Sequence, residues 1–341
     1  MKRVVIDHPN SVVVEEVDIP RPGQDEVCIE VAYCGICGTD THAYKGDHPF
    51  IPLPATPGHE FSGKIHSVGE DAIGFRKGDR VVCEPNLVCG KCYNCSIGRY
   101  NICENLRVMG CQGDGAMAQY FIAPAVKTLH IPDNLPLRDA VLVEPLAVGV
   151  HAVRKAGDLI NKNVVVIGAG TIGLMVCTCV KMAGARNITV SDLTERRLVL
   201  AEKMGATRTV RTGTADLVKT VQDEEPYEGI DVVFECAGVE KSIREAMAVV
   251  RKGGRIIGCG IFGSEVKVKM VDVQDRELEL IGTIMYTRRD ITDAIHMAAG
   301  RALNPDLFIT REFSLDHALQ AFEAALDAKN NVKVIFAVNP E

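Results

Sequence analysis

Two patterns of apolar residues divide the chain. Up to about residue 150, short β-branched runs such as 12–14 and 27–31 alternate with segments dense in glycine and proline. From about residue 160, continuous apolar runs alternate with longer helical patterns. Short strands with frequent turns are typical of a β-barrel, and alternating strands and helices are typical of a parallel sheet. The sequence therefore predicts a β-rich domain followed by an α/β domain with a doubly wound sheet.

The predicted elements follow from these runs. Residues 163–167 are continuously apolar, as in a strand buried on both faces, and a long apolar helix follows at about 171–184. The other strands are predicted at 1–7, 63–68, 80–83, 187–190, 230–235, 255–259 and 332–338, and the other helices at 195–204 and 316–329.

Composition narrows the class of protein. A chain of 341 residues predicts two domains, and a net charge of −7 argues against a nucleic-acid surface or a polybasic membrane contact. We find no apolar run near the ~18–20 residues of a membrane span, and Asp7 comes too early for a signal peptide. The cysteines number thirteen, an odd count that favours reduced thiols and metal binding over disulfides. We therefore expect a cytoplasmic protein.

A glycine motif follows the strand at 163–167. Gly168, Gly170 and Gly173 form G-x-G-x-x-G, and Thr171 and Ile172 open the next helix. The first glycine permits a tight turn, the second lets the backbone approach a pyrophosphate, and the third lets helix and strand pack closely. The helix N-terminus offers N–H groups to phosphates. A loop that serves packing alone is the competing interpretation.

An acid after the next strand supports the nucleotide interpretation. Asp192 stands about 20 residues beyond the glycines, where a carboxylate accepts from ribose hydroxyls and repels a 2′-phosphate. NAD is therefore favoured over NADP. Arg196 and Arg197 lie on the following helix, on a solvated face, with Arg197 a candidate to flank the adenine.

Four cysteines share one short loop. Cys89, Cys92, Cys95 and Cys103 have the spacing of a closed tetrahedral zinc site, with no position left for substrate. Disulfides are disfavoured in a reducing compartment, while an iron–sulfur cluster is compatible with four thiolates. A DNA-binding zinc finger lacks basic support, because the loop carries only Lys91 and Arg99. The sequence predicts a structural zinc lobe over about 86–106.

A second group offers mixed ligands. Cys37 contributes a thiolate, His59 an imidazole, and Glu60 and Glu144 carboxylates. A mixed set suits catalytic zinc, which takes three protein ligands and keeps one open position. Each residue alone also has a structural explanation: a buried thiol, a satisfied histidine, and a helix-starting Glu144-Pro145.

The combined motifs resemble those of the zinc-containing medium-chain dehydrogenase/reductase family, in its sorbitol/polyol branch. They occur in one order across essentially the whole chain: Gly-Ile-Cys-Gly-Thr-Asp from Gly35, Gly-His-Glu from Gly58, the four-cysteine lobe, Glu-Pro-Leu-Ala-Val-Gly-Val-His-Ala from Glu144, and the glycine motif. The resemblance implies a GroES-like barrel as catalytic domain, residues 1–155 and 295–341, around a Rossmann NAD-binding domain, residues 156–294.

The resemblance also implies residue roles. Cys37 and His59 match catalytic zinc ligands. The third ligand stays open. In some polyol dehydrogenases the glutamate that matches Glu60 coordinates the metal, while the residue that matches Glu144 binds the metal's water molecule. In alcohol dehydrogenases the position of Glu144 holds a cysteine, which is itself a ligand. Asp40 matches a carboxylate that orients the zinc histidine.

Thr39 and His42 match a proton relay that runs through the cofactor ribose to solvent. The implied reaction is zinc-dependent hydride transfer from a secondary alcohol of a polyol or sugar derivative to NAD.

Departures from the sorbitol enzymes concern the substrate. The sorbitol enzymes have an Arg-Tyr pair that contacts the substrate, and Met285-Tyr286 stands at that position here, so Tyr286 remains a candidate substrate contact. They also have a tyrosine just after the relay histidine, where this chain has Ala43. Arg288 and Arg289 fit either a solvated charge run or a phosphate or carboxylate on the substrate.

Alternatives remain at this level. Threonine 3-dehydrogenase shares Cys-Gly-Thr-Asp and the relay histidine, butanediol dehydrogenase is a further candidate, and a non-catalytic dinucleotide-binding protein represents another class. The resemblance also implies a homo-oligomer, a tetramer or a dimer, with 281–285 and the zinc lobe as contacts.

Overall fold

The computed structural model describes residues 1–224 and 228–341. These residues form two compact units: unit 1 comprises Met1–Glu144 and Thr287–Glu341, and unit 2 comprises Pro145–Tyr286. The boundaries predicted for the domains, 155/156 and 294/295, fall within the helices α4 (Val143–Ala156) and α10 (Arg288–Ala299). The predicted domain boundaries therefore remain a prediction.

Unit 1 is built on a seven-stranded sheet. Its strand order is β16-β17-β3-β4-β5-β9, with β8 also paired to β3, and only β16 and β17 run parallel. The strands are β3 (Glu26–Ile36), β4 (Glu60–Val68), β5 (Arg80–Cys83), β8 (Tyr120–Pro124), β9 (Thr128–His130), β16 (Ile309–Phe313) and β17 (Lys333–Ala337). Two hairpin-like pairs stand apart from this sheet: β1 (Lys2–His8) with β2 (Ser11–Glu16), and β6 (Asn86–Leu87) with β7 (Arg107–Val108).

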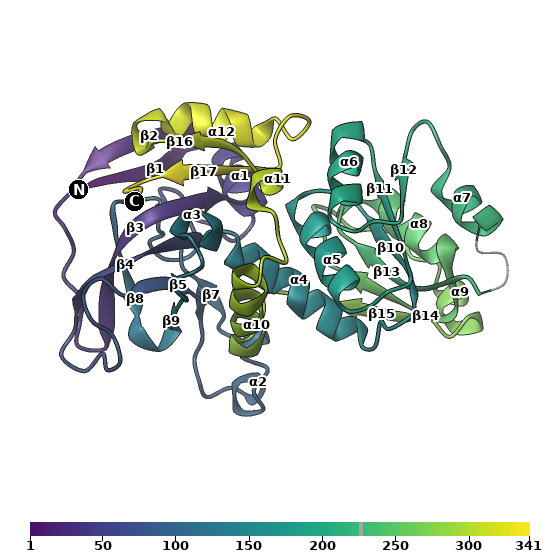
Figure 1. Cartoon of the computed structure of the whole chain (residues 1–341), viewed down its shortest axis with the longest axis horizontal. Helices are drawn as coiled ribbons and strands as arrows, with labels where there is room; N and C mark the ends of the chain where they lie inside the picture. Colours follow the sequence, from purple (N-terminus) through teal and green to yellow (C-terminus); the bar gives the residue numbers. More distant parts are fainter. Residues whose placement is uncertain (225–227) are drawn as a thin grey trace. The chain divides into compact units, whose positions relative to one another are not determined.

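Short helices complete unit 1. They are α1 (Gly38–Lys45), α2 (Tyr93–Ser96), α3 (Leu137–Ala140), α10, α11 (Pro305–Phe308) and α12 (Ala318–Leu326). Figure 1 shows α12 lying along β2, β16 and β17, and its Phe322 is completely buried against the ring of Tyr44 in α1. The C-terminal segment thus packs on the N-terminal part of the chain.

Unit 2 contains a six-stranded parallel sheet of order β12-β11-β10-β13-β14-β15. The strands are β10 (Asn163–Ile167), β11 (Asn187–Asp192), β12 (Arg208–Arg211), β13 (Ile230–Glu235), β14 (Val250–Gly258) and β15 (Glu279–Gly282). The helices are α5 (Thr171–Met182), α6 (Glu195–Lys203), α7 (Leu217–Glu224), α8 (Glu240–Val249) and α9 (Met270–Asp275). The predicted doubly wound sheet is confirmed, and its order reverses between β10 and β13, where such sheets bind ligands.

Most predicted elements match these bounds within a few residues. The predicted strands at 163–167 and 230–235 coincide with β10 and β13. The predicted helix at 316–329 is shorter, because a 3₁₀ turn over Leu315–His317 precedes α12. Among the described residues we find no helix long and apolar enough to cross a membrane.

We predict opposite consequences for two neighbouring glycines of the motif. A Cβ on Gly173 would lie 1.8 Å from the carbonyl oxygen of Gly168, whereas a Cβ on Gly170 meets nothing nearer than Arg197 Nη1 at 3.9 Å. Gly173→Ala should lower the free energy of unfolding by about 1–3 kcal/mol or more, although alanine ordinarily stabilises a helix. Gly170→Ala should cost less than about 1 kcal/mol. Equal midpoints of urea unfolding for the two variants would contradict this packing.

Candidate metal centres and nucleotide site

Two adjacent strands of unit 1 bring the mixed ligand set together. Cys37 follows β3 and caps α1, while His59 and Glu60 stand where β4 begins. The pairing of β3 with β4 places Glu60 opposite Gly35. A Cβ on Gly35 would lie 2.4 Å from Glu60 Oε2, so this glycine leaves the space that the carboxylate occupies. Sequence reasoning treated Gly35 only as part of a motif.

Ligand atoms of Cys37, His59 and Glu60 all lie within 4.8 Å of one another. A thiolate, an imidazole and a carboxylate at this separation fit zinc with one position left open. Glu144 is buried at the start of α4 but is not part of this set. The geometry therefore favours Glu60 over Glu144 as the third ligand, a choice that the sequence left open.

A buried lysine stands behind Glu60. Lys333 Nζ lies 2.6 Å from Glu60 Oε2 and donates to the carbonyl of Ile36 at 3.1 Å, and both side chains are almost completely buried. Burial opposes protonation of Lys333, but Glu60, Cys37 and Glu144 raise its pKa. The ammonium holds one oxygen of Glu60 and leaves the other available to a metal. Sequence reasoning missed Lys333, although a lone lysine inside the apolar run 332–338 is a signal for a buried ion pair.

Asp40 caps a helix beside His59. Its Oδ2 accepts from the backbone N–H of Cys37 at 2.8 Å, while its buried Oδ1 lies 3.9 Å from His59 Nδ1, and the structure gives neither of these two atoms a hydrogen-bond partner. Burial raises the pKa of Asp40. Burial lowers the pKa of His59, but the neighbouring Cys37 and Asp40 raise it well above its usual value. Without metal the site thus favours the charged imidazole, and zinc binding would displace that proton.

The predicted relay residues share helix α1. Thr39 and His42 stand three residues apart and therefore face the same side of the helix. The His42 imidazole is about half exposed, and its Nδ1 lies 2.8 Å from Asp47 Oδ1. Asp47, which sequence reasoning missed, offers a hydrogen-bond acceptor to His42, the more exposed of the two relay residues.

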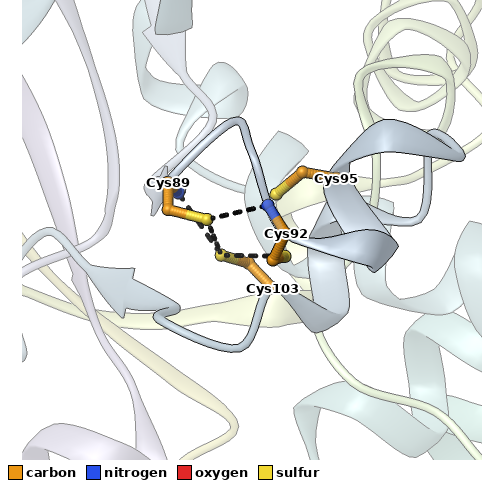
Figure 2. Close-up of side chains that lie close together, drawn as sticks. All are labelled: Cys89, Cys92, Cys95 and Cys103. Carbon is orange, nitrogen blue, oxygen red and sulfur yellow. Dashed lines mark hydrogen bonds between the residues drawn. The ribbon is translucent and has the colours of Figure 1, made fainter.

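The four-cysteine lobe is assembled in the structure. Figure 2 shows the four sulfur atoms turned toward one another, and they all lie within 4.8 Å. Sγ of Cys103 lies 3.5 Å from that of Cys89 and 3.9 Å from that of Cys92. A tetrahedral site with zinc–sulfur bonds of about 2.3 Å has sulfur atoms roughly 3.8 Å apart. The spacing fits zinc and is far longer than a disulfide bond of about 2.05 Å.

Backbone N–H groups prepare this lobe for thiolates. N–H groups of Lys91 and Cys92 lower the pKa of Cys89 to about 6, whereas burial raises that of Cys95 to about 12. The N–H groups of Cys89 and Asn105 both donate to Cys103 Sγ at 3.3 Å. Helix α2 within the lobe has no buried residue, so apolar packing contributes little there.

A polar cluster ties the lobe to Arg288. Glu84 is buried, with Lys127 Nζ at 3.2 Å and Arg288 Nε at 3.4 Å. Arg288 also donates to the carbonyls of Val126 and Thr128, and its backbone N–H donates to the hydroxyl of Tyr100 in the lobe. The Arg288 side chain is therefore partly exposed, but Glu84 and two backbone carbonyls engage its guanidinium. Arg289 is exposed.

In unit 2, the glycine motif joins β10 to α5. Gly168 has φ of +98°, which a side chain would strain, and Gly170 caps α5, whose first residues are Thr171 and Ile172. The N-terminus of α5 is thus positioned to receive phosphates.

Asp192 organises this loop. Its Oδ2 accepts from the N–H of Ala169 and its Oδ1 from that of Thr194, each at 2.8 Å. A carboxylate keeps further lone pairs for ribose hydroxyls. Arg197 Nη1 lies 3.9 Å from Asp192 Oδ2 and faces Gly170, so the structure groups Arg197 with the nucleotide loop. Tyr286, the predicted substrate contact, is completely buried, and its contact with substrate stays a prediction.

Known proteins resemble this chain over nearly its whole length. Residues 23–133 match the family model described as an alcohol dehydrogenase GroES-like domain, and residues 171–300 match that of a zinc-binding dehydrogenase. The chain is 35% identical to D-arabitol-phosphate dehydrogenase of Enterococcus avium over 96% of this chain and 94% of that protein. It is also 35% identical to L-threonine 3-dehydrogenase of Shewanella frigidimarina over 90% of this chain and 92% of that protein.

Among solved structures, an alcohol dehydrogenase of E. coli CFT073 in complex with NADH superposes with a TM-score of 0.93. It is 30% identical, and the match covers 98% of each chain. These findings confirm the predicted GroES-like and Rossmann folds, and they confirm zinc and a nicotinamide cofactor.

We predict that Cys92→Ser removes about one zinc ion per chain and lowers the unfolding temperature, because the lobe has few apolar contacts to replace the metal. Bound zinc is measured by atomic emission. The matched control is Tyr93→Ser, since Tyr93 is the exposed neighbour of Cys92 and should leave zinc content unchanged. Full zinc content in Cys92→Ser would contradict the structural site.

We predict that Lys333→Met lowers the free energy of unfolding by about 3–5 kcal/mol, because it leaves the buried Glu60 carboxylate without its cation. Lys64→Met is the control on β4, the strand that also carries Glu60. Lys64 pairs with Glu341 at the surface, where such a pair contributes about 0–1 kcal/mol. Urea unfolding measures both variants, and similar losses for the two would show that the Lys333–Glu60 pair has no special weight.

Proposed function

We propose a substrate and residue roles for this chain, which belongs to the zinc-containing medium-chain dehydrogenase/reductase family and is a zinc-dependent, nicotinamide-linked alcohol dehydrogenase. It oxidises a secondary alcohol of a polyol or uncharged sugar derivative, with NAD as the hydride acceptor. The observation that carries the proposal is the set Cys37, His59 and Glu60, with Glu60 held by Lys333.

The chain's own residues prepare the reaction. Cys37, His59 and Glu60 hold zinc, and Asp40 lies behind His59 to orient its ring. When bound, zinc acts as a Lewis acid toward a substrate oxygen and the nicotinamide accepts the hydride. Glu144 is buried, and its charge helps to raise the pKa of Lys333. It accepts a hydrogen bond from a second substrate hydroxyl.

Proton removal follows helix α1. Thr39 would accept the hydroxyl proton of the alcohol, and His42 would deliver a proton to solvent beside Asp47. The exposure of His42 supports its place at the solvent end of this proton relay.

The choice of cofactor follows from Asp192. Its carboxylate lies against the glycine loop, where it would accept from ribose hydroxyls and repel the additional phosphate of NADP. Arg197 lies beside it and would flank the adenine.

The substrate charge follows from two engaged cations. Arg288 is held by Glu84, and Lys333 is held by Glu60, so neither is available to a substrate phosphate or carboxylate. This favours an uncharged polyol over a phosphorylated one and over threonine. Threonine 3-dehydrogenase activity is the second candidate, supported by the identity to the Shewanella enzyme.

We also propose a cellular location, an oligomeric state and domain boundaries. Both thiol-containing clusters bind metal only when reduced, which supports a cytoplasmic location. Homo-oligomerisation, to a tetramer or a dimer, is supported by the edge strand β15 and the exposed side chains of Leu280 and Ile284. The divided catalytic domain around an NAD-binding domain is proposed with the boundaries given above.

We predict the following from a panel of pentitols and hexitols, their phosphate esters, sugar acids, butanediol and L-threonine, with NADH absorbance as the readout. An uncharged polyol should exceed its own phosphate ester in kcat/KM by about tenfold or more, because Glu84 and Glu60 already hold Arg288 and Lys333.

The control for this panel is Cys37→Ala, which should abolish turnover of every substrate and still bind NADH. A phosphate ester or threonine as the best substrate would overturn the substrate proposal. Turnover of no compound by protein that retains zinc and NADH would count against the function itself.

A further inference from the structure

Two cysteines of unit 2 occupy matching positions on neighbouring parallel strands. Cys236 directly follows β13 and Cys259 directly follows β14. The last paired residues of these strands are Glu235 and Gly258, so the two cysteines take the next position in the same register. Neighbouring strands lie about 4.8 Å apart, which is within the range of Cα separations that a disulfide spans.

The backbone holds these two positions together. The carbonyl of Glu235 accepts from the N–H groups of Cys259 at 2.8 Å and Gly260 at 2.9 Å. The buried Glu235 side chain accepts from the N–H groups of Ala237 and Gly238, each at 2.8 Å. Both cysteine-bearing turns are therefore fixed on one residue, and a bond between their side chains needs little backbone movement.

Both thiols are partly exposed, and that of Cys259 lies 3.8 Å from the carbonyl oxygen of Ile257. A hydrogen bond with Cys259, together with burial, raises the pKa of the Cys236 thiol. Each cysteine keeps part of its surface open to solvent, unlike the buried Cys177 and Cys179 of α5. Neither cysteine belongs to the metal clusters of unit 1.

We propose that Cys236 and Cys259 form a redox-active dithiol that closes to a disulfide by exchange with a low-molecular-weight disulfide. The Cys259 thiolate attacks one sulfur of that molecule, whose S–S bond breaks and releases one thiolate. The Cys236 thiolate then attacks the Cys259 sulfur of the mixed disulfide and releases the second thiolate. The protein loses two electrons, the small disulfide gains them, and the two cysteine protons end on the released thiols.

The dithiol adjoins the nucleotide loop. The N–H of Cys236 donates to the carbonyl of Ile167 at 2.8 Å, and Gly168 follows Ile167. A Cβ on Gly168 would lie 3.1 Å from the carbonyl carbon of Cys236, and one on Gly173 would lie 3.5 Å from its Cβ. Closing the disulfide moves a side chain packed against this loop, so the oxidised form binds the dinucleotide more weakly. By linkage, bound NADH opposes oxidation by the same factor.

The test uses the zinc-loaded enzyme in buffers of defined glutathione and glutathione disulfide content, without oxygen. After thiols are blocked and the protein is cut with trypsin, the peptides 220–241 and 256–267 each carry one of the two cysteines and no other. We expect these peptides as a linked pair, lighter by two hydrogens than their sum. Saturating NADH should reduce the linked fraction at least about threefold, and reductant should reverse the link.

Controls separate this link from general thiol oxidation. Cys236→Ser and Cys259→Ser should each abolish the linked pair, while Cys177→Ser, which changes a buried thiol of the same unit, should leave it unchanged. Zinc content is measured in parallel, so that oxidation of metal ligands is seen separately. Glutathione adducts without the linked pair would overturn the dithiol. A linked pair whose yield does not change with NADH would overturn the connection to nucleotide binding. Only this connection, and not the dithiol itself, rests on the function proposed above.

Discussion

The buried ion pair of Lys333 with Glu60 is the constraint on which the catalytic centre depends. A carboxylate and an ammonium both almost completely buried are stable only when they are paired at close range. The partners are 273 residues apart in sequence and meet because β17 pairs with β3, which pairs with β4. The C-terminal strand therefore has to return to the N-terminal sheet, and this requirement explains why unit 1 is built from both ends of the chain.

Local patterns predicted the parts of the site that are local in sequence. The glycine motif, the four-cysteine lobe and the pairs around Cys37 and His59 have fixed spacings, and the structure assembles them. Continuous apolar runs likewise located β10 and β13, because strands buried on both faces leave a plain signature. The short edge strand β12 was not predicted.

Long-range pairing was what the sequence did not reveal. Nothing near Glu60 indicates Lys333, and nothing near Arg288 indicates Glu84, because each partner is chosen by strand pairing or by packing of distant segments. The same limit applied to Glu60 and Glu144, which are equivalent as ligands in sequence. The register of β3 against β4, with Gly35 opposite Glu60, separates them.

Unit 1 uses polar clusters where apolar packing is thin. The four-cysteine lobe has an α2 helix without buried residues, and its Tyr100 is instead held by Arg288 and lies 4.7 Å beneath the ammonium of Lys127. Glu84 balances both cations from a buried position. A metal and a charged cluster thus fix a segment that lacks its own core. Because the same structural demands engage Arg288 and Lys333, the substrate we propose is one that is recognised through hydrogen-bond acceptors rather than through positive charge.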